Sequence, residues 1–179
     1  SKDFYYDVHF DYTMLYKKTQ FQAKGQYIRE TLNTEIDSLD SQSGFGTIGL
    51  EIMNQINTVF SIAAGADFQN FTHDSLATQS RVAPYARINA VPSEKVGLSL
   101  HLSSGFKHST FKNYWQDNSY ISHRLPMRPA DETFGMKLKA DVVITEQIKF
   151  KGGYTRQWMN EMFYWQADTG SGLIGLNSI

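Results

Sequence analysis

The residues best suited to recognise a ligand lie in one stretch of about 25 residues, from Lys107 to Asp131. Its aromatic and cationic side chains are His108, Phe111, Lys112, Tyr114, Trp115, Tyr120, His123 and Arg124. Rings and cations together suit a partly aromatic, anionic ligand, such as an iron chelate or a glycan. We predict ligand contacts at four of these residues, Tyr114, Trp115, His123 and Arg124. The alternative is a long loop that packs on its neighbours, because length is only a weak sign of function.

A second candidate is a short polar row near the N-terminus. Asp7, His9 and Asp11 are spaced two residues apart, which puts their side chains on one face of a strand. Imidazole and carboxylate groups bind divalent metals, but a zinc site needs three or four converging ligands. We therefore expect this row to meet water or the cations of a partner strand, and we assign no metal site.

Other motifs lack the context that their chemistry needs. Residues Gly170 to Gly175 match G-x-G-x-x-G, but a dinucleotide site also needs a following helix and an acid about 20 residues later. The acidic stretch from Thr31 to Ser43 does not have the spacing of an EF-hand. The sequence contains no H-E-x-x-H, P-loop or G-x-S-x-G motif. We therefore predict no catalytic residue and no cofactor, and we predict that the protein is not an enzyme.

Composition narrows the class of protein. The 179 residues include 17 Lys and Arg against 18 Asp and Glu, and this net charge of −1 excludes a strongly basic nucleic-acid surface. There is no cysteine, which excludes disulfides, thiolate zinc sites and thiol nucleophiles. Aromatic residues make up 14%, which is typical of β-rich proteins. The mean hydropathy of −0.42 is typical of a soluble protein, but membrane barrels give similar values because their strands alternate apolar and polar residues.

A period of two runs along most of the chain. Between Phe4 and Met14 the even positions are Phe, Tyr, Val, Phe, Tyr and Met, whereas the odd positions are mostly polar. This alternation predicts a strand. The same pattern predicts seven more strands, within residues 21–28, 47–52, 60–69, 81–89, 96–103, 134–144 and 148–155. A ninth strand is expected near Met162 to Ala167, and no segment has a helical period. The predicted fold is an all-β antiparallel meander of about eight to nine long strands.

Strand length and loop length together favour an outer-membrane barrel or part of one. The strands reach about 9–11 residues, which is the span of a bilayer, whereas soluble strands average about 5–6. Alternate connections are short, while those at 31–43, 72–79 and 107–131 are longer, as in barrels with short periplasmic turns and long extracellular loops. The charges on the apolar face, Arg29 and Arg156, are expected near strand ends, where they can reach the interface. Alternation does not say which face is inside, so a soluble sandwich or barrel remains an alternative.

Three segments between Ile62 and Trp165 carry a resemblance to a known family. Val82 to Pro92 and then Leu98 to Lys107 form a Pro-containing strand, a turn, and a strand ending Gly-Phe-Lys. Leu125 to Gly135 forms a Leu-x-x-x-Pro loop and a strand start, and Lys137 to Trp165 forms a hairpin with a Tyr in its second strand. Together they resemble the barrel domain of TonB-dependent outer-membrane receptors. The chain departs from that pattern where Thr-Phe-Gly, ending at Gly135, stands in place of Glu-x-Gly.

The resemblance implies an outer-membrane receptor that imports a scarce nutrient, such as an iron chelate. In that family the ligand binds at the extracellular loops and at a plug domain inside the barrel, and energy arrives through the periplasmic protein TonB. Such barrels have about 22 strands. The sequence has about nine and no plug, so we predict one β domain over residues 1–179 that is a fragment of a larger barrel.

The implied partners are outer-membrane lipid, the nutrient in the full protein, and the TonB complex only through the missing plug. We expect no nucleic acid. A fragment would also have two unpaired edge strands, which invite pairing with another copy. Two alternatives remain open. One is a complete small eight-stranded outer-membrane barrel with a structural role, and the other is a soluble β-barrel that binds a small apolar ligand.

Overall fold

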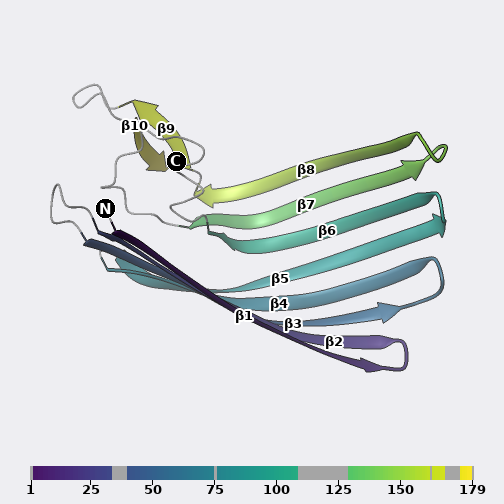
Figure 1. The fold of residues 1–179 in the computed structure, drawn as a ribbon, viewed down its shortest axis with the longest axis horizontal. Helices are drawn as coiled ribbons and strands as arrows, with labels where there is room; N and C mark the ends of the chain where they lie inside the picture. The colour runs from purple at the N-terminus through teal and green to yellow at the C-terminus, as the bar shows by residue number, and fades with distance from the viewer. Residues whose placement is uncertain are drawn as a thin grey trace.

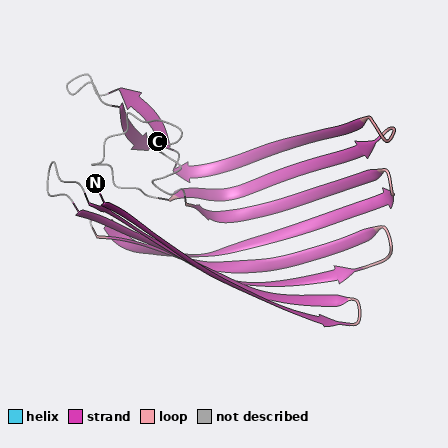
Figure 2. Cartoon of the chain, in the orientation of Figure 1, coloured by secondary structure: helices cyan, strands magenta, loops and turns pink. Residues whose placement is uncertain are grey.

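The computed structural model describes residues 2–33, 40–74, 76–108, 129–161, 163–167 and 174–178, and it contains no helix in these ranges. Eight long strands make up one sheet (Figure 1). They are β1 (Lys2–Tyr16), β2 (Thr19–Asn33), β3 (Asp40–Gln55), β4 (Phe60–His73), β5 (Leu76–Ser93), β6 (Val96–Lys107), β7 (Ala130–Val143) and β8 (Lys149–Glu161). Figure 2 shows that strands make up almost all of the described chain.

The strands follow one another in chain order, and every neighbouring pair is antiparallel. The predicted all-β antiparallel meander is therefore confirmed. The ninth strand forms as β9 (Phe163–Ala167), but it is short and does not extend the meander. It pairs instead with β10 (Ile174–Ser178), which the alternation pattern did not reveal.

The two faces of the sheet differ in chemistry, as the alternation predicts. The apolar face carries Phe10, Phe21, Leu50, Ile62, Val82, Leu98, Leu138 and Tyr154, all of them exposed. The polar face carries Asp11, Lys24, Glu51, Asp67, Arg87, His101, Lys137 and Lys151. The polar face is the more crowded one, since Ala63 is 1% exposed, Ala83 is 2% exposed and Glu51 is 8% exposed. Side chains crowd in this way on the concave side of a curled sheet.

The ends of the hairpins shift steadily across the sheet. One row of paired residues runs Tyr16, Thr19, Asn54, Ile62, Ile88, Leu100, Leu138 and Tyr154. Tyr16 and Thr19 are the last pair before the first turn. The last pair of the fourth hairpin, Val143 with Lys149, lies five residues beyond this row on both strands. This shift is roughly 17 Å at about 3.3 Å per residue. A progressive stagger of this kind is what tilted barrel strands require.

Short turns connect the strands at one end of the sheet. The first turn contains only Lys17 and Lys18, and Lys17 has a φ of 55°, which two-residue hairpins commonly need. In the second turn the Asn57 side chain accepts hydrogen bonds from the backbone N–H groups of Val59 and Phe60, at 2.8 and 2.7 Å. The short connections that the sequence predicts at this end are confirmed.

One predicted long loop is wrong. Residues 72–79 are mostly strand, because His73 pairs with Leu76 and only two residues, 74 and 75, lie between β4 and β5. The alternation is hidden there because both faces carry polar residues. The Asn70 amide donates to the Ser80 hydroxyl across the strands at 2.8 Å, so polar side chains also support the ladder. Residues 34–39 and 109–128, within the other two long connections, lie outside the described residues.

Candidate functional site

The four residues predicted to contact a ligand, Tyr114, Trp115, His123 and Arg124, lie outside the described residues. Their role stays a prediction. The described chain places other polar groups of the sequence close together on the polar face, and these define the site described below.

The row of Asp7, His9 and Asp11 lies on the polar face of the edge strand β1. Asp11 accepts a hydrogen bond from the Gln22 amide at 2.7 Å, and Asp7 accepts one from the Gln26 amide at 3.1 Å. The described residues contain no group of three potential metal ligands. The row therefore meets amide donors on the partner strand β2, where water or the cations of a partner strand were expected.

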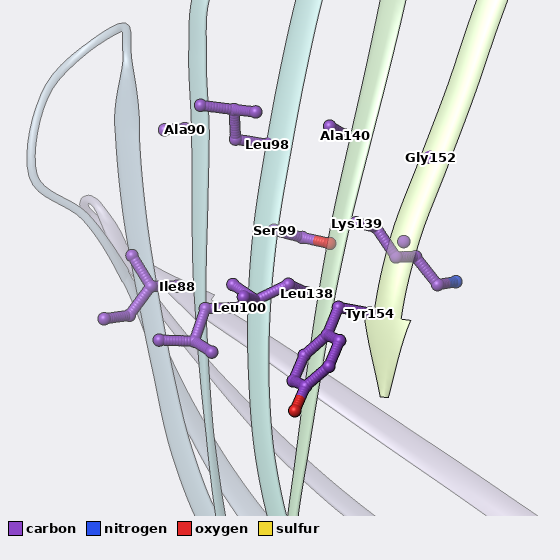
Figure 3. Close-up of a pocket in the computed structure, with 11 residues that line it drawn as sticks. Ile88, Ala90, Leu98, Ser99, Leu100, Leu138, Lys139, Ala140, Gly152 and Tyr154 are labelled. Carbon is purple, nitrogen blue, oxygen red and sulfur yellow. The ribbon is translucent and has the colours of Figure 1, made fainter. Parts of the chain in front are cut away.

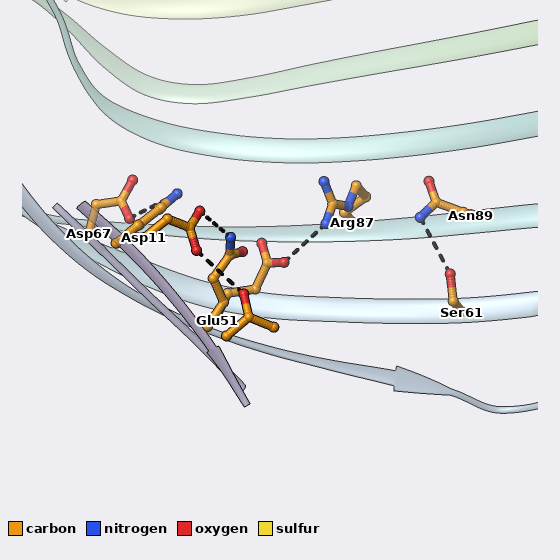
Figure 4. Close-up of polar contacts among 9 residues, drawn as sticks. Asp11, Glu51, Ser61, Asp67, Arg87 and Asn89 are labelled. Atoms are coloured by element: carbon orange, nitrogen blue, oxygen red, sulfur yellow. Dashed lines mark hydrogen bonds and ion pairs between the residues drawn. The ribbon is translucent and has the colours of Figure 1, made fainter. Parts of the chain in front are cut away.

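Ion pairs on the polar face reach over a whole strand. Lys24 on β2 lies 3.3 Å from Asp67 on β4, and its ammonium group lies 4.6 Å from the ring centre of Tyr85 on β5. Arg87 on β5 donates to Glu51 on β3 at 3.0 Å (Figure 4). Strands are spaced about 4.8 Å apart, so each pair joins strands about 10 Å apart.

Glycines on the polar face create the room for these bridges. A Cβ atom at Gly49 would collide with the Asp67 carboxylate and the Lys24 side chain. A Cβ atom at Gly65 would collide with the Tyr85 ring. Small residues at these positions let long charged side chains lie flat across the sheet. The sequence does contain this signal, as glycines at positions where the alternation calls for polar side chains.

A second polar group, the loop-end cluster, lies where β4, β6, β7 and β8 approach the long connections. It consists of Gln69, Ser103, Lys107, Glu132 and Gln157. Glu132 is fully buried and accepts hydrogen bonds from the Ser103 hydroxyl at 2.8 Å and from the Gln157 amide. Lys107 lies 3.1 Å from the same carboxylate. One carboxylate therefore ties β6, β7 and β8 together.

The Gln69 side chain bridges a gap in the ladder between β5 and β6. Pairing of these strands stops at Ala86 and Leu102, next to Pro84, which has no N–H to donate. Beyond that point the backbone N–H of Phe106 donates to the Gln69 side chain of β4 at 2.6 Å. Gly105, with a φ of 114°, allows this irregular backbone, and a Cβ atom there would collide with Gln69. Sequence reasoning missed both buried residues, Gln69 and Glu132.

The chain that leaves β6 turns over the polar face. The His108 ring stacks on Phe45 of β3, with ring centres 4.9 Å apart, and lies 6.1 Å from the ring centre of Phe71 of β4. Its Nε2 atom lies 3.8 Å from the Glu30 carboxylate of β2. Burial among these rings lowers the pKa of His108 to about 4, so the imidazole is neutral at pH 7. His108, the first described residue after β6, therefore lies above β2, β3 and β4, which are two to four strands away from β6 in the sheet.

Charge is divided across the polar face. Strands β1 to β4 carry mainly acids, namely Asp7, Asp11, Glu30, Glu51 and Asp67. Strands β6 to β8 carry five lysines, Lys107, Lys137, Lys139, Lys149 and Lys151, against three acids of β7, Asp131, Glu132 and Asp141. On β5, between these two regions, Arg81 pairs with Asp131 and Arg87 pairs with Glu51. The two edges of the sheet therefore carry opposite charge.

The apolar face contains one shallow hollow of about 500 Å³. Small residues and larger apolar side chains from β5 to β8 line it (Figure 3). The larger residues include Ile88, Leu98, Leu100, Leu138 and Tyr154, and the small residues include Ala90, Ala140 and Gly152. Such a surface can hold an alkyl chain or a flat apolar molecule, but it offers few polar groups to orient one.

No protein-family model, curated protein or solved structure matches this chain. Among the described residues, no helix is long and apolar enough to cross a membrane.

Proposed function

We propose that the chain is a segment of an outer-membrane β-barrel, with the apolar face against lipid and the polar face toward an aqueous interior. The observation that carries this proposal is the exposure of the apolar face. Ile48, Leu50 and Val82 are each more than 60% exposed, and no second layer covers them in the described part of the chain. Soluble monomers rarely expose a continuous apolar patch of more than several hundred Å². Contact with the hydrocarbon of a bilayer would remove the free-energy cost of exposing this apolar surface to water.

Three other features support an outer-membrane barrel. The eight strands are 12–18 residues long, which exceeds the about 9–11 residues that a tilted strand needs to cross a bilayer. The hairpin ends shift in one direction, as they do in barrels, whose strands are tilted relative to the barrel axis. The polar face is crowded and four ion pairs join its strands, as expected for side chains on the inside of a curved sheet.

We further propose that the full protein is a TonB-dependent receptor that imports a scarce nutrient such as an iron chelate. This proposal rests on the resemblance of the segments between Ile62 and Trp165 to that receptor family, and on the direction of the chain after β6. His108 brings the start of the 107–131 connection over the polar face. The rings and cations that follow would then contact the ligand from above the barrel interior.

A labelling experiment tests the membrane proposal. The chain has no cysteine, so single cysteines can be placed at will. Lys137 and Leu138 are adjacent on β7, both are exposed, and they lie on opposite faces. In native outer membranes we expect a water-soluble maleimide to label Lys137→Cys at least tenfold faster than Leu138→Cys. Equal labelling of the two variants would contradict the proposal.

Receptor function requires the full protein. We expect that replacing Tyr114, Trp115 and Arg124 with Ala lowers the affinity of the intact receptor for its nutrient at least tenfold. Lys149→Ala, at the opposite end of the barrel wall, is the control and should leave the affinity unchanged. If the triple variant binds as well as the parent, the loop does not contact the ligand.

One observation favours a second candidate, a soluble barrel that binds a small apolar ligand. The hollow between β5 and β8 has the apolar lining that such a ligand would need. In that case the apolar face would line the interior. Leu138→Cys would then resist labelling in detergent-free solution, and an apolar dye would compete with its slow labelling.

A further inference from the structure

We propose that the two edges of the sheet recognise each other, and that in the 179-residue chain β1 of one copy pairs with β8 of a second copy. This inference goes beyond the receptor proposal, because it concerns the open edges and not the nutrient. In the structure β1 and β8 form opposite edges of the sheet, and among the described residues each is paired on one side only (Figure 1). An open edge presents unpaired N–H and C=O groups that favour the addition of another strand.

The two edges carry complementary charge on the same face. Asp7 and Asp11 of β1 are exposed, and their only described side-chain partners are uncharged. Lys149 and Lys151 of β8 are also exposed and form no ion pair within the described chain. Pairing β1 with β1 would bring acids together, and pairing β8 with β8 would bring lysines together. Only the unlike pairing places opposite charges across the strands, which is stabilising.

The direction of the strands and the stagger of the sheet leave two registers. β1 runs toward the short-turn end and β8 runs away from it, so two copies with the same orientation meet as antiparallel strands. If β1 of the second copy continues the stagger next to β8, Tyr154 of β8 lies opposite Phe10 in the first register and opposite Val8 in the second. The second register puts Lys151 directly opposite Asp11. Both registers keep the apolar faces of the two copies on the same side.

We propose pairing with a second copy, and not closure of one chain on itself, because of the space that the side chains on the polar face need. An eight-stranded barrel has an interior only wide enough for its side chains to fill. Here the polar face already carries charged groups that lie across two strands, Lys24 and Arg87 among them, and the His108 ring above them. Two copies joined at both edges would form sixteen strands with no free edge and a wider interior.

Disulfide trapping tests this contact. Asp11→Cys and Lys151→Cys are prepared as separate single variants of the full chain, refolded in detergent, mixed and oxidised. We expect a covalent species of twice 20.4 kDa in the mixture, at least fivefold more abundant than in either variant alone. Tyr12→Cys mixed with Lys151→Cys is the matched control, since neighbouring residues of a strand point to opposite faces.

A charge exchange provides a second measurement that does not depend on cysteine chemistry. Asp11→Lys should lower the fraction of two-copy species in light scattering at least fivefold, and mixing it with Lys151→Asp should restore that fraction. Two results would overturn the inference. One is a mixture of the single cysteine variants with no covalent pair. The other comes from a chain that carries both Asp11→Cys and Lys151→Cys, if that chain forms only an intramolecular bond at the mass of one chain. Neither result bears on the labelling of Leu138→Cys, so the membrane proposal is judged separately.

Discussion

The Arg87 guanidinium of β5 lies 3.0 Å from the Glu51 carboxylate of β3, so this ion pair crosses the whole width of β4. It does so above Gly65, where any side chain would meet Tyr85, and beside Ala63, which is almost fully buried. The polar face is thus held together by contacts between alternate strands as well as by the backbone ladder. Four consequences of this arrangement can be measured on the chain in detergent or lipid.

Glu51 and Arg87 are expected to be energetically coupled. Glu51 is nearly buried and Arg87 is partly exposed, so the interaction is stronger than a surface pair and weaker than a buried one. A double-mutant cycle with Glu51→Gln and Arg87→Met, followed by urea unfolding, should give a coupling free energy of about 1 kcal/mol. Additive effects of the two substitutions would show that the two side chains do not interact.

Gly49 is expected to tolerate no side chain. Gly49→Val would push apart Lys24 and Asp67, and overpacking of this kind costs roughly 1–3 kcal/mol in the free energy of unfolding. Gly97→Val is the matched control, because a Cβ atom there would meet only the Asp141 Cβ, at 4.0 Å. Valine favours strands, so Gly97→Val should be neutral or slightly stabilising. Equal effects at both positions would contradict the crowding on the polar face.

Glu132 is expected to be the most important residue of the loop-end cluster. Its carboxylate connects Ser103, Lys107 and Gln157, and Glu132→Ala would leave these three groups without that partner. We expect the free energy of unfolding to fall by about 2–4 kcal/mol. Thr133→Ala, at the next and exposed position, should change it by less than about 0.5 kcal/mol. Equal stability of the two variants would rule out the bridging role.

His108 should make the loop end sensitive to acid. Its pKa is lowered from 6.5 to about 4 by burial, so the unfolded chain takes up a proton below pH 6.5, whereas the folded chain does so only below about pH 4. The stabilisation is complete above pH 6.5 and is lost as the pH falls toward 4, by roughly 3 kcal/mol in total.

The measurement compares unfolding at pH 7 and pH 4.5 in the parent and in His108→Phe. Phenylalanine keeps the stack on Phe45 but cannot titrate, so the variant should lose less stability at pH 4.5 than the parent does. If parent and variant lose the same amount, His108 is protonated in the folded chain.

The all-β meander was predictable because its signal is local. Each strand shows alternation within its own residues, as β1 does from Phe4 to Met14. The bounds were less predictable, since most strands extend beyond the alternating segment. At the start of β5, Thr78, Gln79 and Ser80 put polar residues on both faces, so no alternation marks the strand there, and only pairing with β4 reveals it.

The candidate site was mostly not predictable. Glu132 sits beside a bulge that shifts the register between β6 and β7, and Gln69 bonds to a strand two places away. The hydrogen-bond partners of Glu132 and Gln69 are distant from these residues in sequence, so no local pattern predicts the contacts. His108 was expected as part of a ligand-binding loop, but the structure shows it stacked on Phe45, with its ring centre 6.1 Å from that of Phe71.

The strands, their order as a meander and the opposite chemistry of the two faces follow from local patterns in the sequence. A period of two needs only neighbouring residues, and short turns join neighbouring strands. In contrast, the folded sheet is needed to know which face is crowded, which charges meet across alternate strands, and how the hairpin ends shift. These properties depend on the curvature and register of the whole sheet. Curvature and register arise from the sum of all seven strand pairings in the sheet, and no single segment encodes them.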